Sequence, residues 1–359
     1  FDIEAEYVTR VEGHGNIVVN TTEGTLDTCE WQVVESPRFF ESMVVGKDYE
    51  AVPHVTSRIC GICSASHVDC SLKAVEDAIG VEISPQDEAL RKLALYAEII
   101  QSHVLHVGYL ALPDLFDSKS VLPLANTHEA EVRTIIRLHR LGNEMLETIA
   151  GRSVHTQRLI PGGFSRIPSE DELVELREDL RGAFDDLDAV VELLEGLVGK
   201  LPDFSRETEF ISLTHPEEYA FYGGTLYSSD TGELDNGDYE DVVNEYVTEQ
   251  STAKFARHNR ESYFVGALAR CNNNFDQLSP RGKQVAAAFD LEPVCHNPFM
   301  NNVAQVVEVA HLFERSIELI DDLLETGLVP QSDYNRPDID PDDGRGIGIV
   351  EAPRGILIH

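Results

Sequence analysis

The chain has 359 residues, 42% of them apolar, and its 64 acidic against 28 basic residues give a formal net charge of −36. This length is sufficient for one large domain or two ordinary ones with a sizeable core. Because nucleic acids and anionic lipids are themselves polyanions, a negative field of this size argues against both as partners. No apolar run approaches the roughly 20 residues needed to cross a bilayer, so no membrane span is expected.

The acidic residues are spread along the chain and lysine is rare, a composition that a salt-rich cytoplasm would tolerate because salt screens self-repulsion. We therefore expect a halophilic source. The sequence contains six cysteines, which are too few and too scattered for a disulfide scaffold. A reducing, cytoplasmic compartment and a metal-binding role for some of these cysteines are expected instead. The six are Cys29, Cys60, Cys63, Cys70, Cys271 and Cys295.

Residues 1–45 are expected to be rich in β-structure. Two β-branched runs, 6–11 and 16–20, flank a glycine-rich turn and predict a hairpin, and residues 30–35 predict a third strand. Apolar residues at helical spacing then predict helices, mainly within 66–200 and 250–330. The individual helices are expected at 66–80, from Pro85 to a stop at Pro113, and at 129–150, 169–199 and 300–327. Residues 200–245 are interpreted as an irregular surface excursion, and 331–345 as a linker.

The most specific pattern in the chain is Arg-x-Cys-Gly-x-Cys-x-x-x-His at residues 58–67. Two cysteines three apart can direct both sulfurs at one metal, and the positive charge of Arg58 favours their thiolate form. His67 follows Cys63 by about one helical turn and could orient a ligand. A Cys-x-x-Cys pair by itself is shared by zinc sites and redox dithiols.

The complete pattern resembles the N-terminal nickel-binding motif of the large subunit of [NiFe] hydrogenases. A second stretch, Glu-Ala-Pro-Arg-Gly at 351–355 followed by apolar residues and His359, resembles another signature of that family. By this resemblance Cys60 is a terminal nickel ligand and Cys63 bridges nickel to iron. The resemblance also implies that Pro353 and Arg354 border the carbonyl and cyanide ligands of the iron.

The resemblance assigns three carboxylates as well. Glu12 lies in Arg-Val-Glu-Gly-His and corresponds to a proton-relaying glutamate of the family. Glu41 follows Pro-Arg-Phe-Phe and corresponds to a ligand of a structural Mg²⁺, for which a hard oxygen donor is suitable. Asp114 in Leu-Ala-Leu-Pro-Asp is expected to be a carboxylate of the metal pocket, near Arg354.

The resemblance implies reversible heterolytic cleavage of H₂ by a subunit of the cytoplasmic, multimeric group. No cysteines are spare for iron–sulfur clusters, so these clusters are expected only in a small partner subunit, with further electron-transfer subunits beyond it. The fold expected is mainly α, a bundle of long helices with a small N-terminal β-sheet, in one domain spanning 1–359. The family's closing Cys-x-x-Cys is absent, so the chain is interpreted as C-terminally incomplete or as a degenerate relative.

Three other classes of protein share part of this pattern. The quinone-reductase large subunit of respiratory complex I has the same fold but lacks the nickel cysteines. A structural zinc protein could use Cys60, Cys63 and His67 but needs a fourth ligand. A thiol–disulfide oxidoreductase would place its Cys-x-x-Cys after a strand in a βαβ unit, which the long helices do not favour.

Overall fold

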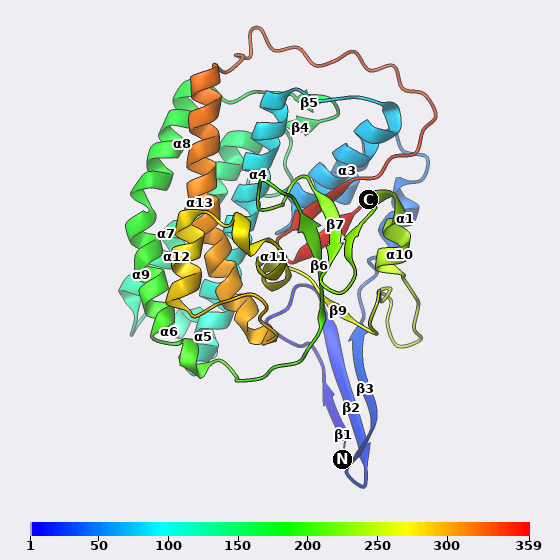
Figure 1. Ribbon diagram of the computed structural model, residues 1–359, viewed down its shortest axis with the longest axis vertical. Coiled ribbons are helices and arrows are strands. Elements are labelled where there is room, and N and C mark those ends of the chain that lie inside the picture. The colour runs from blue at the N-terminus through cyan, green and yellow to red at the C-terminus, as the bar shows by residue number, and fades with distance from the viewer. Residues whose placement is uncertain (1) are drawn as a thin grey trace.

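The computed structural model describes residues 2–359, and long helices form most of it (Figure 1). Helices α7, α8, α9, α12 and α13 stand together at the left of Figure 1, and most strands lie at the right, where α1, α3 and α10 also lie. This arrangement confirms the predicted mainly α fold. The longest helices are α3 (Ser64–Ile79), α4 (Pro85–Leu105), α7 (Glu129–Ala150), α8 (Glu170–Gly182), α9 (Phe184–Glu195) and α13 (Asn301–Thr326). The shorter ones are α1 (Phe39–Val44), α2 (Val52–Thr56), α5 (Leu112–Leu115), α6 (Val121–Leu124), α10 (Tyr239–Val243), α11 (Ala267–Asn274) and α12 (Pro280–Ala288).

Helix α4 lies at the centre of the bundle, packed between α7 and α13. It begins as the sequence predicts, with Ser84 accepting a hydrogen bond from the amide of Asp87 and Pro85 in the first turn. The expected end at Pro113 is wrong, because the α-helical hydrogen bonding of α4 ends at Leu105. A π-helical turn follows over His106–Ala111. Pro113 lies in the first turn of α5, where its missing N–H costs no hydrogen bond. Among the described residues, no helix is long and apolar enough to cross a membrane.

The N-terminal sheet has the order β1–β2–β3, with strands Asp2–Ala5, Gly15–Thr22 and Thr25–Val33, and it projects from the body of the molecule (Figure 1). The sheet was expected, but the predicted strand at 6–11 is wrong. Tyr7 and Arg10 adopt φ values of 54° and 71°, which a strand cannot contain. Residues 6–14 therefore form a long loop, and this loop reaches the body of the protein.

Residues 200–245 also differ from the expected surface excursion. They contain β6 (Glu209–Thr214), whose residues are almost all buried, and β7 (Thr225–Ser228) and β8 (Gly232–Leu234) pair beside it. The sheet has the order β8–β7–β6–β9, and β9 (Tyr263–Phe264) runs parallel to β6. Acidic and glycine-rich flanks conceal this short apolar run in the sequence. The predicted helix at 169–199 is likewise divided, at Ala183, into α8 and α9.

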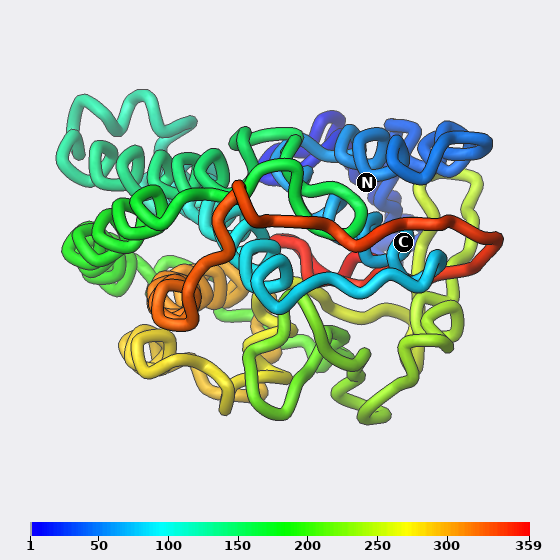
Figure 2. Tube along the Cα trace, turned by 90° about the horizontal axis from the view of Figure 1, so that it is seen from above, coloured from blue at the N-terminus to red at the C-terminus, as the bar shows by residue number. Residues whose placement is uncertain are grey.

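Residues 344–348, called the strap below, pack closely along α3. The expected linker at 331–345 has no regular structure, and in Figures 1 and 2 its orange-to-red trace leaves α13, runs along the outside and returns inward. At Gly344, Gly346 and Gly348 an added Cβ would lie 1.8, 2.1 and 2.0 Å from the carbonyl oxygens of Ala78, Ala74 and Cys70. Two extended residues advance about 6.7 Å and four helical residues about 6 Å, so the two repeats match.

The strap leads directly into the last hairpin, formed by β10 (Ile349–Ala352) and β11 (Gly355–Ile358). The two residues at its tip are Pro353 and Arg354. A short pair, β4 (Leu159–Ile160) and β5 (Gly163–Phe164), completes the strands of residues 2–359. The position of the strap on α3 therefore sets where the tip of the C-terminal hairpin lies relative to the residues that precede α3.

Candidate metal centre

Cys60 and Cys63 lie between α2 and α3, with Cys63 immediately before the first residue of α3. Their sulfurs are joined as a disulfide, with an Sγ–Sγ distance of 1.98 Å. The two residues are only 9% and 8% exposed. The N-terminus of a helix stabilises negative charge, so the reduced pair would be favoured as thiolates here.

Two predicted residues from distant parts of the chain meet at Cys60. The guanidinium of Arg354 donates from Nη2 to Cys60 Sγ at 3.4 Å and from Nη1 to Ser102 Oγ at 3.0 Å. Glu12, in the loop between β1 and β2, places its Oε1 3.9 Å from the same sulfur. The structure thus brings together Glu12, the cysteine pair and Arg354. Burial lowers the pKa of Arg354, and the negative charges of Glu12 and Glu98 oppose that shift.

Ser102 and Glu98 were not assigned from the sequence. They lie one turn apart on α4 and are almost fully buried. Glu98 accepts hydrogen bonds from the amides of Ala65 and Ser66, at 2.6 and 2.7 Å, and from the Ser66 hydroxyl. It therefore caps the start of α3, and burial raises its pKa to about 7 against these hydrogen bonds. The sequence signal that could have identified them is the spacing of four residues between Glu98 and Ser102, which places a carboxylate and a hydroxyl on one face of a largely apolar helix.

His67, four residues after Cys63 on α3, stacks on His359, with ring centroids 5.4 Å apart. His67 Nδ1 lies 3.3 Å from His359 Nε2, and His359 Nδ1 lies 2.7 Å from the hydroxyl of Ser71. Burial lowers the pKa of His67 to about 3, aided by the charges of His359 and Arg354, and burial lowers that of His359 to about 4. Both rings are therefore neutral at pH 7, and together they link α3 to the end of β11.

Asp114 and Glu41 lie apart from the Arg354–Cys60 contact. Asp114 forms an ion pair with Arg10 at 2.8 Å and is 56% exposed, whereas Arg354 bonds to Ser102. Asp114 does line a cavity of about 760 Å³, together with Arg10 and His106. Glu41 on α1 is 63% exposed and pairs with Lys254 at 2.9 Å. The magnesium role of Glu41 and the pocket role of Asp114 stay predictions.

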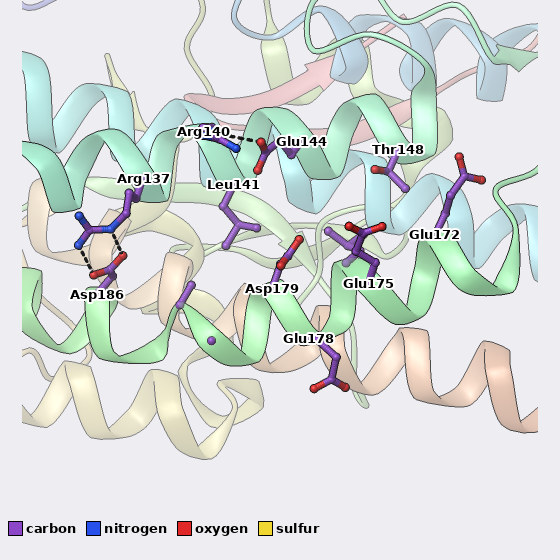
Figure 3. Close-up of a pocket in the computed structure, with 13 residues that line it drawn as sticks. Arg137, Arg140, Leu141, Glu144, Thr148, Glu172, Glu175, Glu178, Asp179 and Asp186 are labelled. Carbon is purple, nitrogen blue, oxygen red and sulfur yellow. Dashed lines mark hydrogen bonds and ion pairs between the residues drawn. The ribbon is translucent and has the colours of Figure 1, made fainter.

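A second groove of about 760 Å³ lies between α7 and the α8–α9 pair (Figure 3). Its lining is charged, and ion pairs cross or border it, from Arg137 to Asp186 and from Arg140 to Glu144 (Figure 3). None of the residues predicted for the metal site lines it. Exposed ion pairs of this kind form an ordinary solvated surface, so this groove is not the candidate site.

The donor set at the cysteine pair suits soft metals. Reduced, Cys60 and Cys63 supply two thiolates, which favour nickel and iron over the hard cations. Within residues 2–359, no group of three or more His, Cys, Asp or Glu side chains is placed to hold a metal. The cysteine pair therefore fits as two ligands of a larger set, and the predicted zinc alternative with His67 as third ligand is not formed.

Asp69 is a buried acid within α3, two residues beyond His67. Neither of its carboxylate oxygens has a hydrogen-bond partner among the described residues. Burial, reinforced by Glu98 and Glu76 and opposed by Arg91 and Lys73, raises its pKa to about 8. The folded protein therefore keeps this proton at pH values where the unfolded chain has lost it.

Replacing Asp69 by asparagine is expected to remove a pH dependence of stability. A folded-state pKa above the unfolded value of 3.8 gives stability that is fully present below about pH 4 and is lost as pH rises toward 8. Asp69 is expected to contribute about 1.4 kcal/mol per pH unit to the slope between pH 5 and 7, and the variant should lack this contribution. Denaturant unfolding at several pH values measures it. Asp179→Asn, at an exposed position, should keep the wild-type slope, and a wild-type slope in Asp69→Asn would contradict the prediction.

Comparison with known proteins places these residues in a family. Residues 38–156 match the nickel-dependent hydrogenase family. The alpha subunit of sulfhydrogenase 1 from Pyrococcus furiosus is 31% identical over 361 residues, covering 99% of this chain and 82% of that subunit. The chain belongs to the nickel-dependent hydrogenases. The hydrogenase chain is also 28% identical to the beta subunit of the NAD-reducing hydrogenase HoxS from Cupriavidus necator, covering 98% of this chain and 79% of that subunit.

The fold agrees with the same family. The crystal structure of an NAD⁺-reducing [NiFe]-hydrogenase in the H₂-reduced state superposes with a TM-score of 0.88 and 30% identity, covering all of this chain and 84% of the other. The predicted hydrogenase large subunit is thereby confirmed. The structural zinc protein and the thiol–disulfide oxidoreductase are correspondingly disfavoured.

Proposed function

We propose that this hydrogenase large subunit holds a Ni–Fe centre at Cys60 and Cys63 and cleaves H₂ heterolytically and reversibly. The observation that carries the proposal is the meeting of Glu12, the cysteine pair and Arg354 at one part-buried point. These residues come from the N-terminal loop, the start of α3 and the C-terminal hairpin. A purely structural role of the cysteines would not explain why a carboxylate from the N-terminal loop and a guanidinium from the C-terminal hairpin both contact Cys60 Sγ.

The residues around the cysteines have distinct roles in this proposal. When bound, the metal pair with carbonyl and cyanide ligands on iron supplies the site at which H₂ is polarised. Glu12 takes up the proton at its carboxylate and passes it outward, as a group beside the reacting centre must. Arg354, with Pro353 before it, presents a permanent positive charge and a fork of N–H donors to small anionic ligands. His67, stacked on His359, supports the position of the cysteine pair. Asp114 lines the neighbouring cavity, and Glu41 binds a structural Mg²⁺.

Electrons have to leave through another polypeptide. The free cysteines of this chain are scattered, as Cys29 is exposed, Cys70 and Cys271 are buried and Cys295 is half-buried. Iron–sulfur clusters need several thiolates around one point. We therefore place the clusters in a small partner subunit of a cytoplasmic, multimeric hydrogenase. The relatives' names, which designate alpha and beta subunits, support further partners.

The experiment that tests the proposed function is metal analysis of the protein matured in its own host. Mass spectrometry should find nickel and iron near one each per chain in addition to any cluster iron, and the infrared spectrum should show CO and CN stretching bands. Protein without nickel and without these bands would support the nickel-free, complex I-like alternative. Zinc alone would make the cysteine pair structural.

The charge of −36 leads to a prediction about salt. Lowering ionic strength from molar salt to about 0.01 M lengthens the screening distance from about 3 to 30 Å. Self-repulsion of the acidic surface should then lower the thermal midpoint by ten degrees or more. Thermal unfolding at several KCl concentrations measures this effect, and sucrose at matched osmolality controls for solute exclusion. A midpoint independent of salt would contradict a halophilic origin.

A further inference from the structure

Arg270 on α11 is fully buried, and all of its donors are used. A guanidinium has five N–H bonds. Nε and Nη2 donate to the two carboxylate oxygens of Glu308, both at 2.7 Å, and Nη1 donates to Glu351 at 2.9 Å. The remaining two N–H groups donate to the backbone carbonyls of Ala352 at 2.9 Å and Pro353 at 3.2 Å. Five donors therefore meet five acceptors.

The two carbonyls held by Arg270 directly precede Arg354. The opposite side of the same turn is fixed by the chain that leads into α11. Gly266 has φ +90°, and a Cβ there would lie 2.9 Å from the carbonyl oxygen of Arg354. Gly355 has φ +146°, and a Cβ there would lie 2.5 Å from Cγ2 of Val265. The tip of the C-terminal hairpin is thus in close contact both with the residues that lead into α11 and with the side chain of Arg270.

Arg270 is itself held rigidly. Glu308 on α13 also contacts His103 Nε2 at 2.6 Å and accepts from the Tyr219 hydroxyl at 2.7 Å. Burial alone would raise the pKa of Glu308, but the charge and hydrogen bonds of Arg270 lower it to about 2. Glu351 further accepts from the amide of Leu213 at 2.8 Å. The Arg270–Glu308 ion pair is therefore permanent at neutral pH, and residues of α4, α13 and β6 hold the two carboxylates that contact Arg270.

We propose that Arg270 is a positioning residue for the metal site: by holding the carbonyls of Ala352 and Pro353, it keeps Arg354 in reach of Cys60 Sγ and Ser102 Oγ. The inference rests on the proposed function of Arg354. Lysine cannot replace Arg270, because an ammonium has three donors on a flexible stem and no planar fork. Nothing in this role requires Arg270 to touch the metal or the substrate.

Arg91 offers a matched control. It is also fully buried, and its guanidinium is bidentate to Glu76 at 2.7 and 2.6 Å and bonded to the carbonyl of Ile160 at 3.1 Å. It makes no hydrogen bond to residues 349–359. Arg270→Lys and Arg91→Lys therefore disturb equally buried ion pairs, and only the first disturbs the tip of the C-terminal hairpin.

The experiment compares both variants in the assembled, metal-loaded enzyme by hydrogen exchange of residues 349–359, H₂ turnover and thermal midpoint. In Arg270→Lys we expect exchange of residues 349–359 to rise about 10-fold and kcat to fall 10- to 100-fold, with KM nearly unchanged, since small misplacement at a reacting centre costs this much. Arg91→Lys should lower the midpoint similarly but keep both exchange and kcat within about twofold of wild type.

Unchanged exchange of residues 349–359 in Arg270→Lys, or an equal rise in Arg91→Lys, would overturn the proposal. If Arg270→Lys does not assemble, Glu351→Gln is measured in the same way and should raise that exchange about threefold. Arg354→Lys separates the two hypotheses. Full turnover in Arg354→Lys would refute the role of Arg354, whereas exchange in Arg270→Lys would still report whether Arg270 holds the turn.

Discussion

Replacement of both Cys60 and Cys63 by serine is expected to lower nickel content at least 10-fold and to abolish H₂ turnover. Hydroxyls are poor ligands for soft metals at neutral pH, whereas thiolates bind them strongly. Both cysteines are buried, and Arg354 contacts Cys60. Among the described residues, no group of three or more His, Cys, Asp or Glu side chains offers another metal site. Metal analysis and H₂-dependent dye reduction measure the two effects.

The control for this double variant is Cys29→Ser. Cys29 is an exposed free cysteine on β3, and its removal should leave both nickel and turnover at wild-type values. Full nickel content in the Cys60/Cys63 double variant would place the metal elsewhere. Loss of nickel in Cys29→Ser would show that serine substitution acts through folding or assembly and not through ligand loss.

Arg354→Lys is expected to reduce H₂ turnover about 100- to 1000-fold while nickel and iron contents stay at wild-type values. The range is that of removing one preorganised donor from a developing charge. Lysine keeps the charge but cannot reach Cys60 and Ser102 with two donors of one plane. Turnover measured at saturating H₂, with metal content measured on the same sample, separates the two effects.

Arg137→Lys serves as the control for Arg354→Lys, since Arg137 is exposed and pairs with Asp186 on α9. Its turnover should equal that of the wild type. A turnover in Arg354→Lys within about threefold of wild type would remove Arg354 from the mechanism. A parallel loss of metal in Arg354→Lys would assign it to holding the metal site together instead.

The helices and the central motif could be predicted because their signals are local. Apolar spacing defined α7 over Glu129–Ala150, and caps such as Ser84 defined where α4 begins. The prediction failed at segments whose structure is determined by tertiary contacts. The loop at 6–14 contacts Asp114 and Cys60 through Arg10 and Glu12 in place of pairing as a strand. Only the folded chain shows that β6 is buried.

The same limit applies to the site. The motifs identified Cys60, Cys63 and Arg354, and in the folded chain Arg354 donates to Cys60. Asp114 was expected to lie near Arg354 in the metal pocket, whereas the residue that accepts a hydrogen bond from Arg354 there is Ser102. Asp114 lies twelve residues further along the chain, beyond the π-helical turn, and pairs with Arg10 instead. A change of helical pitch moves every later side chain to a new face, and the sequence did not show that change.

The glycine strap on α3 has a consequence for biosynthesis. Cys60 and Arg354 are 294 residues apart, and the glycines at 344–348 must reach α3 before the hairpin can dock. At roughly 5–20 residues per second, a ribosome needs about 15–60 s to make that intervening chain. Through this interval the nascent polypeptide presents both thiols uncovered. Both thiols can therefore be reached before Arg354 contacts Cys60, and docking of the glycines at 344–348 on α3 ends that interval.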